Sequence, residues 1–176
     1  MLNKNIYFFE TMNSVYECTP DNDFGYRLKM TELYDVDLIK VSDLIDSKHT
    51  RFLNTGVPHC VFEVENLDKF EVYQNGKRIR YEARFKEGTN ANFFEMISGN
   101  KLRIRTYERG VENETLSCGT GAVATALTAA YFYDIKDLVI LQTLGGELAV
   151  KFNQDLTEVY LCGKVEKVFD GQFQIN

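Results

Sequence analysis

Tryptophan is missing from this 176-residue sequence, and prolines and closely spaced cysteines are scarce. Only two prolines and twelve glycines occur, which argues against long disordered linkers. The four cysteines lie far apart and form no CxxC pair, so neither a zinc site nor a redox dithiol is expected. The N-terminal residues show no basic segment followed by an apolar stretch, and a cytoplasmic protein with reduced thiols is therefore expected.

Clusters of positive charge and long apolar runs are also missing. The net charge of −6 argues against a nucleic-acid surface, which normally needs grouped lysines and arginines. The longest uncharged run covers 115–133, and its helical part is shorter than the ~20 apolar residues that span a bilayer. Neither nucleic acid nor a membrane is expected as a partner. The length suits one domain, which we expect to cover 1–176.

Most of the chain shows the patterns typical of β-strands. Apolar and polar residues alternate, or aromatic and β-branched residues form short runs. The expected strands are 6–11, 14–18, 26–30, 60–64, 91–97, 102–107, 138–143, 147–152, 158–162 and 164–169.

Turns and short helices interrupt these strands. Gly145 and Gly146 suit the tight turn of a hairpin, because such turns need positive φ angles. The last two expected strands form a second candidate hairpin. Short helices are expected at 41–46, with Ser42 as a possible cap, and around 75–85.

The segment 119–133 differs from the rest of the chain. It is rich in alanine, carries no charge and is apolar around its whole circumference, so a helix there must be buried on every side. Strands precede and follow it. The sequence therefore predicts an α+β fold in which a curved, barrel-like mixed sheet wraps around a central helix at about 119–133.

Cys118 stands immediately before this helix, within Ser117-Cys118-Gly119-Thr120-Gly121. A helix N-terminus has unpaired N–H groups and a partial positive charge, and glycines allow a ligand to approach the backbone. An anion can be held there, and a lowered thiol pKa is expected for Cys118. A cysteine protease or acyltransferase could use the same arrangement, and a buried, inert cysteine is an equally open alternative.

A charged pair, Glu108-Arg109, precedes Cys118 at the end of an expected strand. Strand ends beside a helix N-terminus are common places for ligand sites, and an arginine there can bind a carboxylate with two hydrogen bonds. A solvated surface pair is the alternative for these two charges.

Three ordered motifs resemble the diaminopimelate epimerase family, and the resemblance extends weakly over the residues before Asn54. The longest motif, RTYERGVENETLSCGTGAVATA, contains the family's ERG, ET and CG(S/T)G elements. The other two are NTGVPHCVFEV at 54–64 and EGTNANFFE at 87–95. This resemblance implies a cofactor-independent isomerase of lysine biosynthesis, in which one cysteine thiolate removes the α-proton of diaminopimelate and a second thiol protonates the opposite face.

The resemblance also implies roles for single residues. Cys118 matches the second catalytic cysteine, and Glu108 and His59 match residues that tune the thiols. The residues that match substrate contacts are Asn90 and Arg109 at the distal end and Gly119 and Thr120 at the reacting carboxylate.

The sequence departs from the family pattern in two places. The family's GNPH motif is Gly56-Val57-Pro58-His59 here, and Asn54 is a candidate to replace the amide that Val57 lacks. The GNG…C element of the family's first half has no counterpart, so the chain is equivalent to the C-terminal lobe of a two-lobed enzyme. One thiol cannot serve both faces of a carbon, and we expect no more than trace activity from this chain alone.

Three interpretations follow from one catalytic cysteine. The chain is a C-terminal half of an epimerase, which we favour; or a subunit completed by another chain, including a second copy that brings two Cys118 thiols together; or a non-catalytic amino-acid- or carboxylate-binding domain. A proline racemase or a phenazine-biosynthesis-like isomerase is the nearest alternative chemistry. Because one lobe alone should expose apolar surface, we also expect self-association through phenylalanines and tyrosines of the N-terminal strands.

Overall fold

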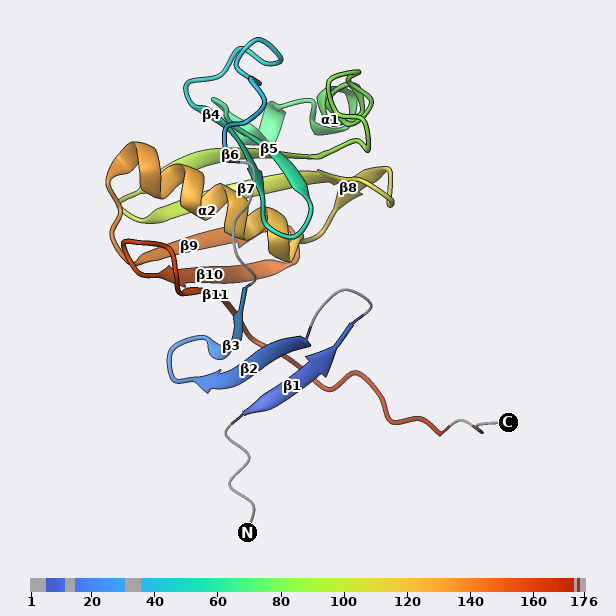
Figure 1. Ribbon diagram of the computed structural model, residues 1–176, viewed down its shortest axis with the longest axis vertical. Helices are drawn as coiled ribbons and strands as arrows, with labels where there is room; N and C mark the ends of the chain where they lie inside the picture. The colour runs from blue at the N-terminus through green and yellow to red at the C-terminus, as the bar shows by residue number, and fades with distance from the viewer. Residues whose placement is uncertain (1–5, 12–14, 31–35, 173, 175–176) are drawn as a thin grey trace.

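The computed structural model describes residues 6–11, 15–30, 36–172 and 174, and Figure 1 shows how they are arranged. The helical elements are the 3-10 helix η1 (Leu67–Lys69) and the α-helices α1 (Val72–Arg80) and α2 (Gly119–Tyr133). The strands are β1 (Tyr7–Glu10), β2 (Val15–Asp21), β3 (Gly25–Lys29), β4 (Thr50–Asn54), β5 (Pro58–Glu63), β6 (Asn90–Ser98), β7 (Lys101–Glu108), β8 (Asn113–Thr115), β9 (Leu138–Thr143), β10 (Gly146–Phe152) and β11 (Val159–Gly163).

All the strands belong to one mixed sheet. Its order is β1-β2-β3-β11-β10-β9-β7-β6-β5-β4, and β8 pairs with β7 beside this path. The α+β class and the mixed sheet are confirmed. The expected barrel-like closure is wrong, because no ladder among the described residues joins the edge strands β1 and β4. Helix α2 packs against the concave face of the sheet and buries its apolar side chains. The sheet therefore does not need to close into a barrel to bury that face.

Two pairs of strands are parallel, and a helix connects each pair. α1 lies between β5 and β6, and α2 lies between β7 and β9. Both crossovers step along the sheet in the same direction, but β7 runs antiparallel to β6. Crossovers of the usual right hand therefore place the two helices on opposite faces, as Figure 1 shows.

Helix α2 forms the centre of the first core. It spans the predicted residues, and those from Gly121 to Ala129 are all buried. Apolar side chains of β4 to β7, β9 and β10 pack around it, including Leu53, Phe94 and Leu141. Its alanines let these strands approach closely, which is why the sequence needs so many of them.

The second core lies on the other face of β4 to β7. Cys60, Phe62 and Phe93 point to this side and pack with Ile79 of α1 and with residues of the 36–49 segment. Successive residues of a strand point to opposite faces, so β5 and β6 contribute to both cores in turn.

Several expected elements differ from the structure. No helix forms at 41–46; its apolar residues pack into the second core as turns, and a segment of six residues is short for a helix. The helix expected at 75–85 begins and ends earlier, at Val72–Arg80. The strand expected at 164–169 is wrong, because β11 pairs with β10 and β3 and no hairpin follows it.

Other expectations about the strands are confirmed, corrected or extended. β9 and β10 form the predicted hairpin, but Gly146, with a φ of 137°, is the first residue of β10, and Gly145 in the turn has no positive φ, so that part of the prediction is wrong. Strands β4 and β8 were not expected. Ser14, the first residue of one expected strand, lies outside the described residues.

Apolar side chains are exposed on the N-terminal strand, as expected for this part of the chain. Phe8 and Phe9 of β1 are 67% and 52% exposed. Self-association through them stays a prediction. Among the described residues, no helix has both the length and the apolar character needed to cross a membrane.

Candidate active site

Polar side chains gather where β5 and β6 begin and β7 ends, at one end of these neighbouring strands. The Cα register pairs His59 with Asn90 and Asn92 with Thr106, because β5 and β6 are parallel and β7 is antiparallel to them. His59 is two residues before Val61, and Asn92 is two residues before Phe94, so each pair shares one face of its strand. Val61 and Phe94 belong to the core around α2. The alternation of the strands thus places these polar groups on the α2 side.

Cys118 is the N-cap of α2 and is partly buried. No side chain caps this helix end, and the first intrahelical bond runs from the Ala122 N–H to the Cys118 carbonyl. The amides of Gly119 and Thr120 therefore have no partner within the helix. The Cys118 sulfur lies 3.6 Å from Thr120 Oγ1. The predicted position of the thiol at the start of the buried helix is confirmed.

The predicted lowering of the Cys118 pKa is wrong. Burial raises the pKa of this thiol to about 11, and the negative charge of Glu108 raises it further, whereas the Thr120 hydroxyl and the Gly121 N–H lower it. Desolvation and the nearby carboxylate thus outweigh the hydrogen bonds from Thr120 and Gly121 in setting this pKa. At neutral pH the sulfur keeps its proton.

Glu108 is the last residue of β7, so the predicted strand end is confirmed. Its Oε1 accepts a hydrogen bond of 2.6 Å from Thr115 Oγ1 on β8. The turn between these strands returns the chain to α2. Glu108 is therefore held near the Cys118 thiol by two strands that pair with each other.

His59 is fully buried. Its Nδ1 is 3.1 Å from Asn92 Nδ2, and its Nε2 has no hydrogen-bond partner among the described residues. Burial lowers the pKa of this ring to about 3, and the charge of Arg109 acts in the same direction. His59 is thus a neutral side chain at physiological pH.

Asn90 and Arg109 are brought into direct contact. The Arg109 backbone N–H donates to Asn90 Oδ1 at 2.8 Å, and Asn90 Nδ2 donates to the Pro58 carbonyl at 3.0 Å. The Arg109 guanidinium donates to the Glu87 carbonyl at 3.1 Å. Asn90 therefore ties the starts of β5 and β6 to the end of β7.

Asn54 ends β4 and shapes the turn before β5. Its Oδ1 accepts a hydrogen bond of 3.1 Å from the Gly56 N–H. The next residue, Thr55, donates from Oγ1 to the Thr120 carbonyl at 3.0 Å and so fixes this turn against α2. Whether the Asn54 amide also serves the role that Val57 cannot fill stays a prediction.

Comparison with known families shows which group of proteins carries this arrangement. The family model of diaminopimelate epimerase matches residues 51–168, which is most of the chain and includes every predicted site residue. The chain belongs to the diaminopimelate epimerase family.

Members of this family with curated names are similar over much of the chain. A diaminopimelate epimerase from Aquifex aeolicus is 46% identical over 125 residues, which cover 69% of this chain and 44% of the relative. One from Chlorobaculum tepidum is 38% identical over 173 residues, covering 94% of this chain and 64% of the relative. The chain thus spans about half to two thirds of the length of these relatives.

Solved structures share the fold at low sequence identity. A PhzF-family phenazine biosynthesis protein from Bacillus anthracis has a TM-score of 0.63 and 14% identity, covering 92% of this chain and 65% of that one. A protein described as a predicted epimerase from Pseudomonas aeruginosa has a TM-score of 0.62 and 14% identity, with coverages of 94% and 67%. At such identities the likeness concerns architecture alone.

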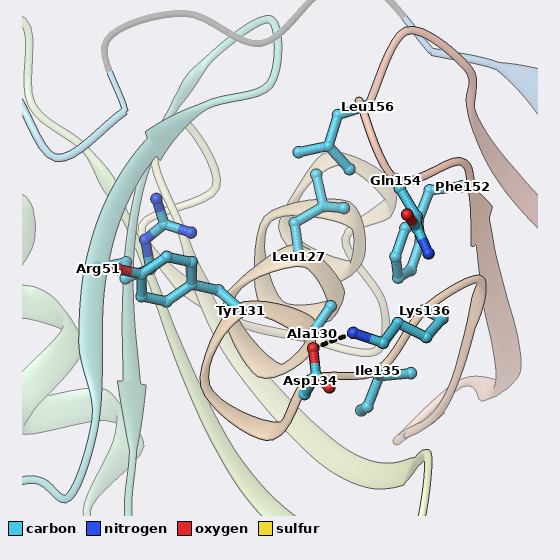
Figure 2. Close-up of a pocket in the computed structure, with 10 residues that line it drawn as sticks. All are labelled: Arg51, Leu127, Ala130, Tyr131, Asp134, Ile135, Lys136, Phe152, Gln154 and Leu156. Atoms are coloured by element: carbon cyan, nitrogen blue, oxygen red, sulfur yellow. Dashed lines mark hydrogen bonds and ion pairs between the residues drawn. The ribbon is translucent and has the colours of Figure 1, made fainter.

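The cavity in Figure 2 lies at the other end of α2 from the epimerase motif. It has a volume of about 320 Å³ and is lined by Leu127, Tyr131 and Asp134 of this region, together with Arg51, Phe152 at the end of β10 and residues of the turn that follows it. None of the predicted site residues lines it. This cavity is therefore separate from the residues of the epimerase motif.

Residues that the sequence does not predict complete the site. Asn92, Thr106, Thr115 and Thr55 hold the predicted residues in place, and a Cβ on Gly121 would come within 2.3 Å of Asn92 Oδ1. The signal in the sequence is the alternation Asn90-Ala91-Asn92, which puts two polar side chains on the same face of a buried strand. No group of three or more histidine, cysteine or acidic side chains in the described ranges is arranged to hold a metal.

Proposed function

We propose that this chain provides one of the two proton-transferring faces of a diaminopimelate epimerase, with Cys118 as the proton-carrying group. The observation that carries this proposal is the position of Cys118 at the uncapped start of a buried helix, beside Glu108. The family membership supports diaminopimelate as the substrate.

In this proposal, the N-terminus of α2 binds the substrate carboxylate that is attached to the reacting carbon. The amides of Gly119 and Thr120 have no partner within the helix, and the helix N-terminus favours a negative charge. A carboxylate held there accepts two backbone hydrogen bonds. As the α-proton leaves, negative charge spreads from the carbon into this carboxylate, so the same amides stabilise the carbanion.

Cys118 acts first as an acid in this proposal, because its raised pKa keeps the proton on sulfur. A base on the opposite face takes the α-proton, and the electron pair left on carbon accepts the proton from the Cys118 sulfur. The S–H bond breaks as the new C–H bond forms, which leaves a Cys118 thiolate and a substrate of inverted configuration. In the reverse direction, this thiolate removes the proton.

The distal amino acid of the substrate is assigned to Arg109 and Asn90. Arginine binds carboxylates through two parallel hydrogen bonds, and its guanidinium here makes one bond to a backbone carbonyl. Asn90 uses both ends of its amide to fix the neighbouring backbone, so we propose that it positions Arg109 in addition to contacting substrate.

The opposing base lies outside the described residues in this proposal, because one sulfur cannot occupy both faces of a carbon. The chain corresponds to the second lobe of a two-lobed epimerase, and no cofactor takes part. We expect the chain alone to show no more than trace epimerase activity.

Incubation of the purified chain with LL-diaminopimelate tests these points. We expect nuclear magnetic resonance to show shifts of the Gly119 and Thr120 amides on binding, and chiral analysis to show no more than trace inversion. Cys118→Ala is the control and should keep the amide shifts. Turnover at the rate of a full-length family member would contradict the half-site proposal, and unmoved amides at saturating substrate would contradict the binding site.

A carboxylate-binding domain without catalysis is the second candidate, and the raised pKa of Cys118 favours it as much as an acid role. Exchange of the substrate α-proton with D2O distinguishes the two. In the epimerase half, a Cys118 thiolate formed at high pH exchanges this proton, and exchange rises about tenfold per pH unit towards the thiol pKa. In a binding domain, wild type and Cys118→Ala show the same background exchange.

A further inference from the structure

A single side chain, Asn92, holds the ring of His59. Its Nδ2 lies 3.1 Å from His59 Nδ1 and 3.1 Å from the Cys60 carbonyl oxygen, and its Oδ1 accepts from Thr106 Oγ1 at 3.1 Å. Asn92 itself is fully buried. These contacts use both hydrogens of its amide nitrogen.

The Cys60 carbonyl determines which way the Asn92 amide is turned. A carbonyl oxygen only accepts hydrogen bonds, so the group facing it must be the NH2 of Asn92. The second hydrogen of that NH2 is then directed at His59 Nδ1, which must accept it. In the neutral ring, the proton therefore sits on Nε2.

The Nε2–H of His59 is left without a partner inside the described part of the chain. A buried donor without an acceptor is costly, and such groups in native proteins often belong to sites that act on a ligand. Asn92 Oδ1 lies against Gly121 in the first turn of α2, so the His59–Asn92 pair adjoins the residues assigned to the substrate carboxylate.

We infer that Asn92 is a positioning residue that fixes His59 as an Nε2–H donor, and that this donor serves an oxygen atom of the substrate held at the start of α2. The assignment of the proton to Nε2 stands on the hydrogen bonds of this chain. The assignment of its acceptor rests on the proposed function.

The first part is tested without any substrate. Long-range proton–nitrogen correlation spectra distinguish the two neutral forms of a histidine ring, and a His49→Gln background leaves His59 as the one histidine observed. We expect wild-type His59 to carry its proton on Nε2. A proton on Nδ1 in this spectrum would overturn the inference directly.

Asn92→Asp changes the acceptor pattern with little change in shape. An aspartate only accepts, so it should draw the proton to His59 Nδ1 and reverse the spectrum. Asn100→Asp is the matched control, because Asn100 also donates from its amide to a backbone carbonyl, that of Leu138 at 3.0 Å, away from the site. The control should keep the Nε2–H form. An unchanged His59 spectrum in folded Asn92→Asp would contradict the positioning role.

Thr106→Val provides a second variant if Asn92→Asp does not fold. It removes the hydroxyl that anchors Asn92 Oδ1 and leaves both hydrogens of the amide nitrogen in place. We expect the Nε2–H form to persist with a broadened signal. A fully reversed tautomer here would show that Thr106, and not the Cys60 carbonyl, sets the amide orientation, and would overturn the inference.

The second part uses meso-diaminopimelate as the probe. The Nε2 signal of wild-type His59 should shift on saturation, and Asn92→Asp should weaken binding roughly tenfold, as expected when one hydrogen bond to a charged group is lost. If the Gly119 and Thr120 amides respond and Nε2 does not, the acceptor assignment is wrong while the proposed function stands. If none of them responds, the proposed function fails and the tautomer result is unaffected.

Discussion

The two ends of α2 differ in the kind of polar group that lacks a partner. At the N-terminal end, the amides of Gly119 and Thr120 have no partner within the helix, and the buried His59 Nε2 has none among the described residues. At the C-terminal end, Tyr133 accepts a hydrogen bond from Lys48 at 2.7 Å and donates one to the buried Glu63 at 2.5 Å.

This difference in unpaired polar groups indicates which end of α2 is suited to bind a ligand. The C-terminal end borders the cavity of Figure 2. There Tyr133 bonds to Lys48 and to Glu63 Oε1, and Glu63 Oε2 has no hydrogen-bond partner among the described residues. The N-terminal end has its polar groups arranged for something the chain does not itself supply. The groups without a partner at the N-terminal end are hydrogen-bond donors beside a cysteine, which suits an anionic ligand, whereas the one at the C-terminal end is a carboxylate oxygen.

The largest effect is expected from filling the space at the N-terminal end. A Cβ on Gly121 would lie 2.3 Å from Asn92 Oδ1 and 3.2 Å from the Cys118 sulfur. We expect Gly121→Val to lower the free energy of unfolding by about 3 kcal/mol, at the upper end for overpacked cores. Urea denaturation measures this change.

Gly119→Ala is the matched control at the same helix end. Its Cβ would meet only the tip of the Leu161 side chain, at 2.9 Å, and that side chain can move. We expect a loss under about 1 kcal/mol. Equal losses for the two variants would show that α2 does not touch Asn92 as closely as described.

The next effect concerns the uncharged histidine. The pKa of His59 is lowered to about 3 in the folded chain, below the ~6.5 of an unfolded histidine, so its contribution to stability is full above pH 6.5 and is lost as the pH falls. Between pH 7 and pH 5 this loss is about 2 kcal/mol. Urea denaturation at pH 7 and at pH 5 measures the free energy of unfolding. Its fall between these pH values should be smaller in His59→Gln than in wild type by this amount.

His49→Gln is the control for the pH experiment, because His49 lies at the other end of α2, stacked on Phe132 at 4.0 Å between ring centroids. It should keep the wild-type fall in stability. The prediction is contradicted if His49→Gln abolishes the fall in the free energy of unfolding between pH 7 and pH 5 while His59→Gln retains it.

The smallest effect is expected at the C-terminal end of α2. Tyr133→Phe removes the hydroxyl that donates to Glu63 Oε1, which leaves that oxygen with Lys48 Nζ at 3.7 Å. We expect a loss of about 1 kcal/mol in the free energy of unfolding and no change in diaminopimelate binding. Tyr131→Phe, at an exposed neighbour, should change neither.

The main elements of the fold could be predicted from local patterns. Helix α2 was predictable because an uncharged, alanine-rich segment has only one stable location, inside the fold. The 41–46 segment was not, because its buried Val41, Leu44 and Ile45 show the spacing of a helix while packing as turns. Sheet closure was equally out of reach, since it depends on a ladder between distant strands.

The candidate site could be predicted only as far as its residues lie in continuous motifs, and the roles of those residues stay predictions. Cys118, Glu108 and His59 could be named from the sequence, but the pKa of Cys118 could not be judged, because burial and the Glu108 charge depend on tertiary packing. Asn92 was missed for the same reason. Its contacts are to His59 and Thr106, which lie 33 and 14 residues away in the chain.

The alternation in β6 has a consequence for how this chain tolerates change in length. Asn92 faces α2, and Ala91 and Phe93 face the apolar core beside α1. One residue inserted in this strand would turn the side chains that follow it to the opposite faces of the sheet. The Asn92 amide would then lie among aromatic rings, and a phenylalanine would lie at the N-terminus of α2. We therefore expect this strand to tolerate no insertion, because the residues that form the candidate site also fix its register.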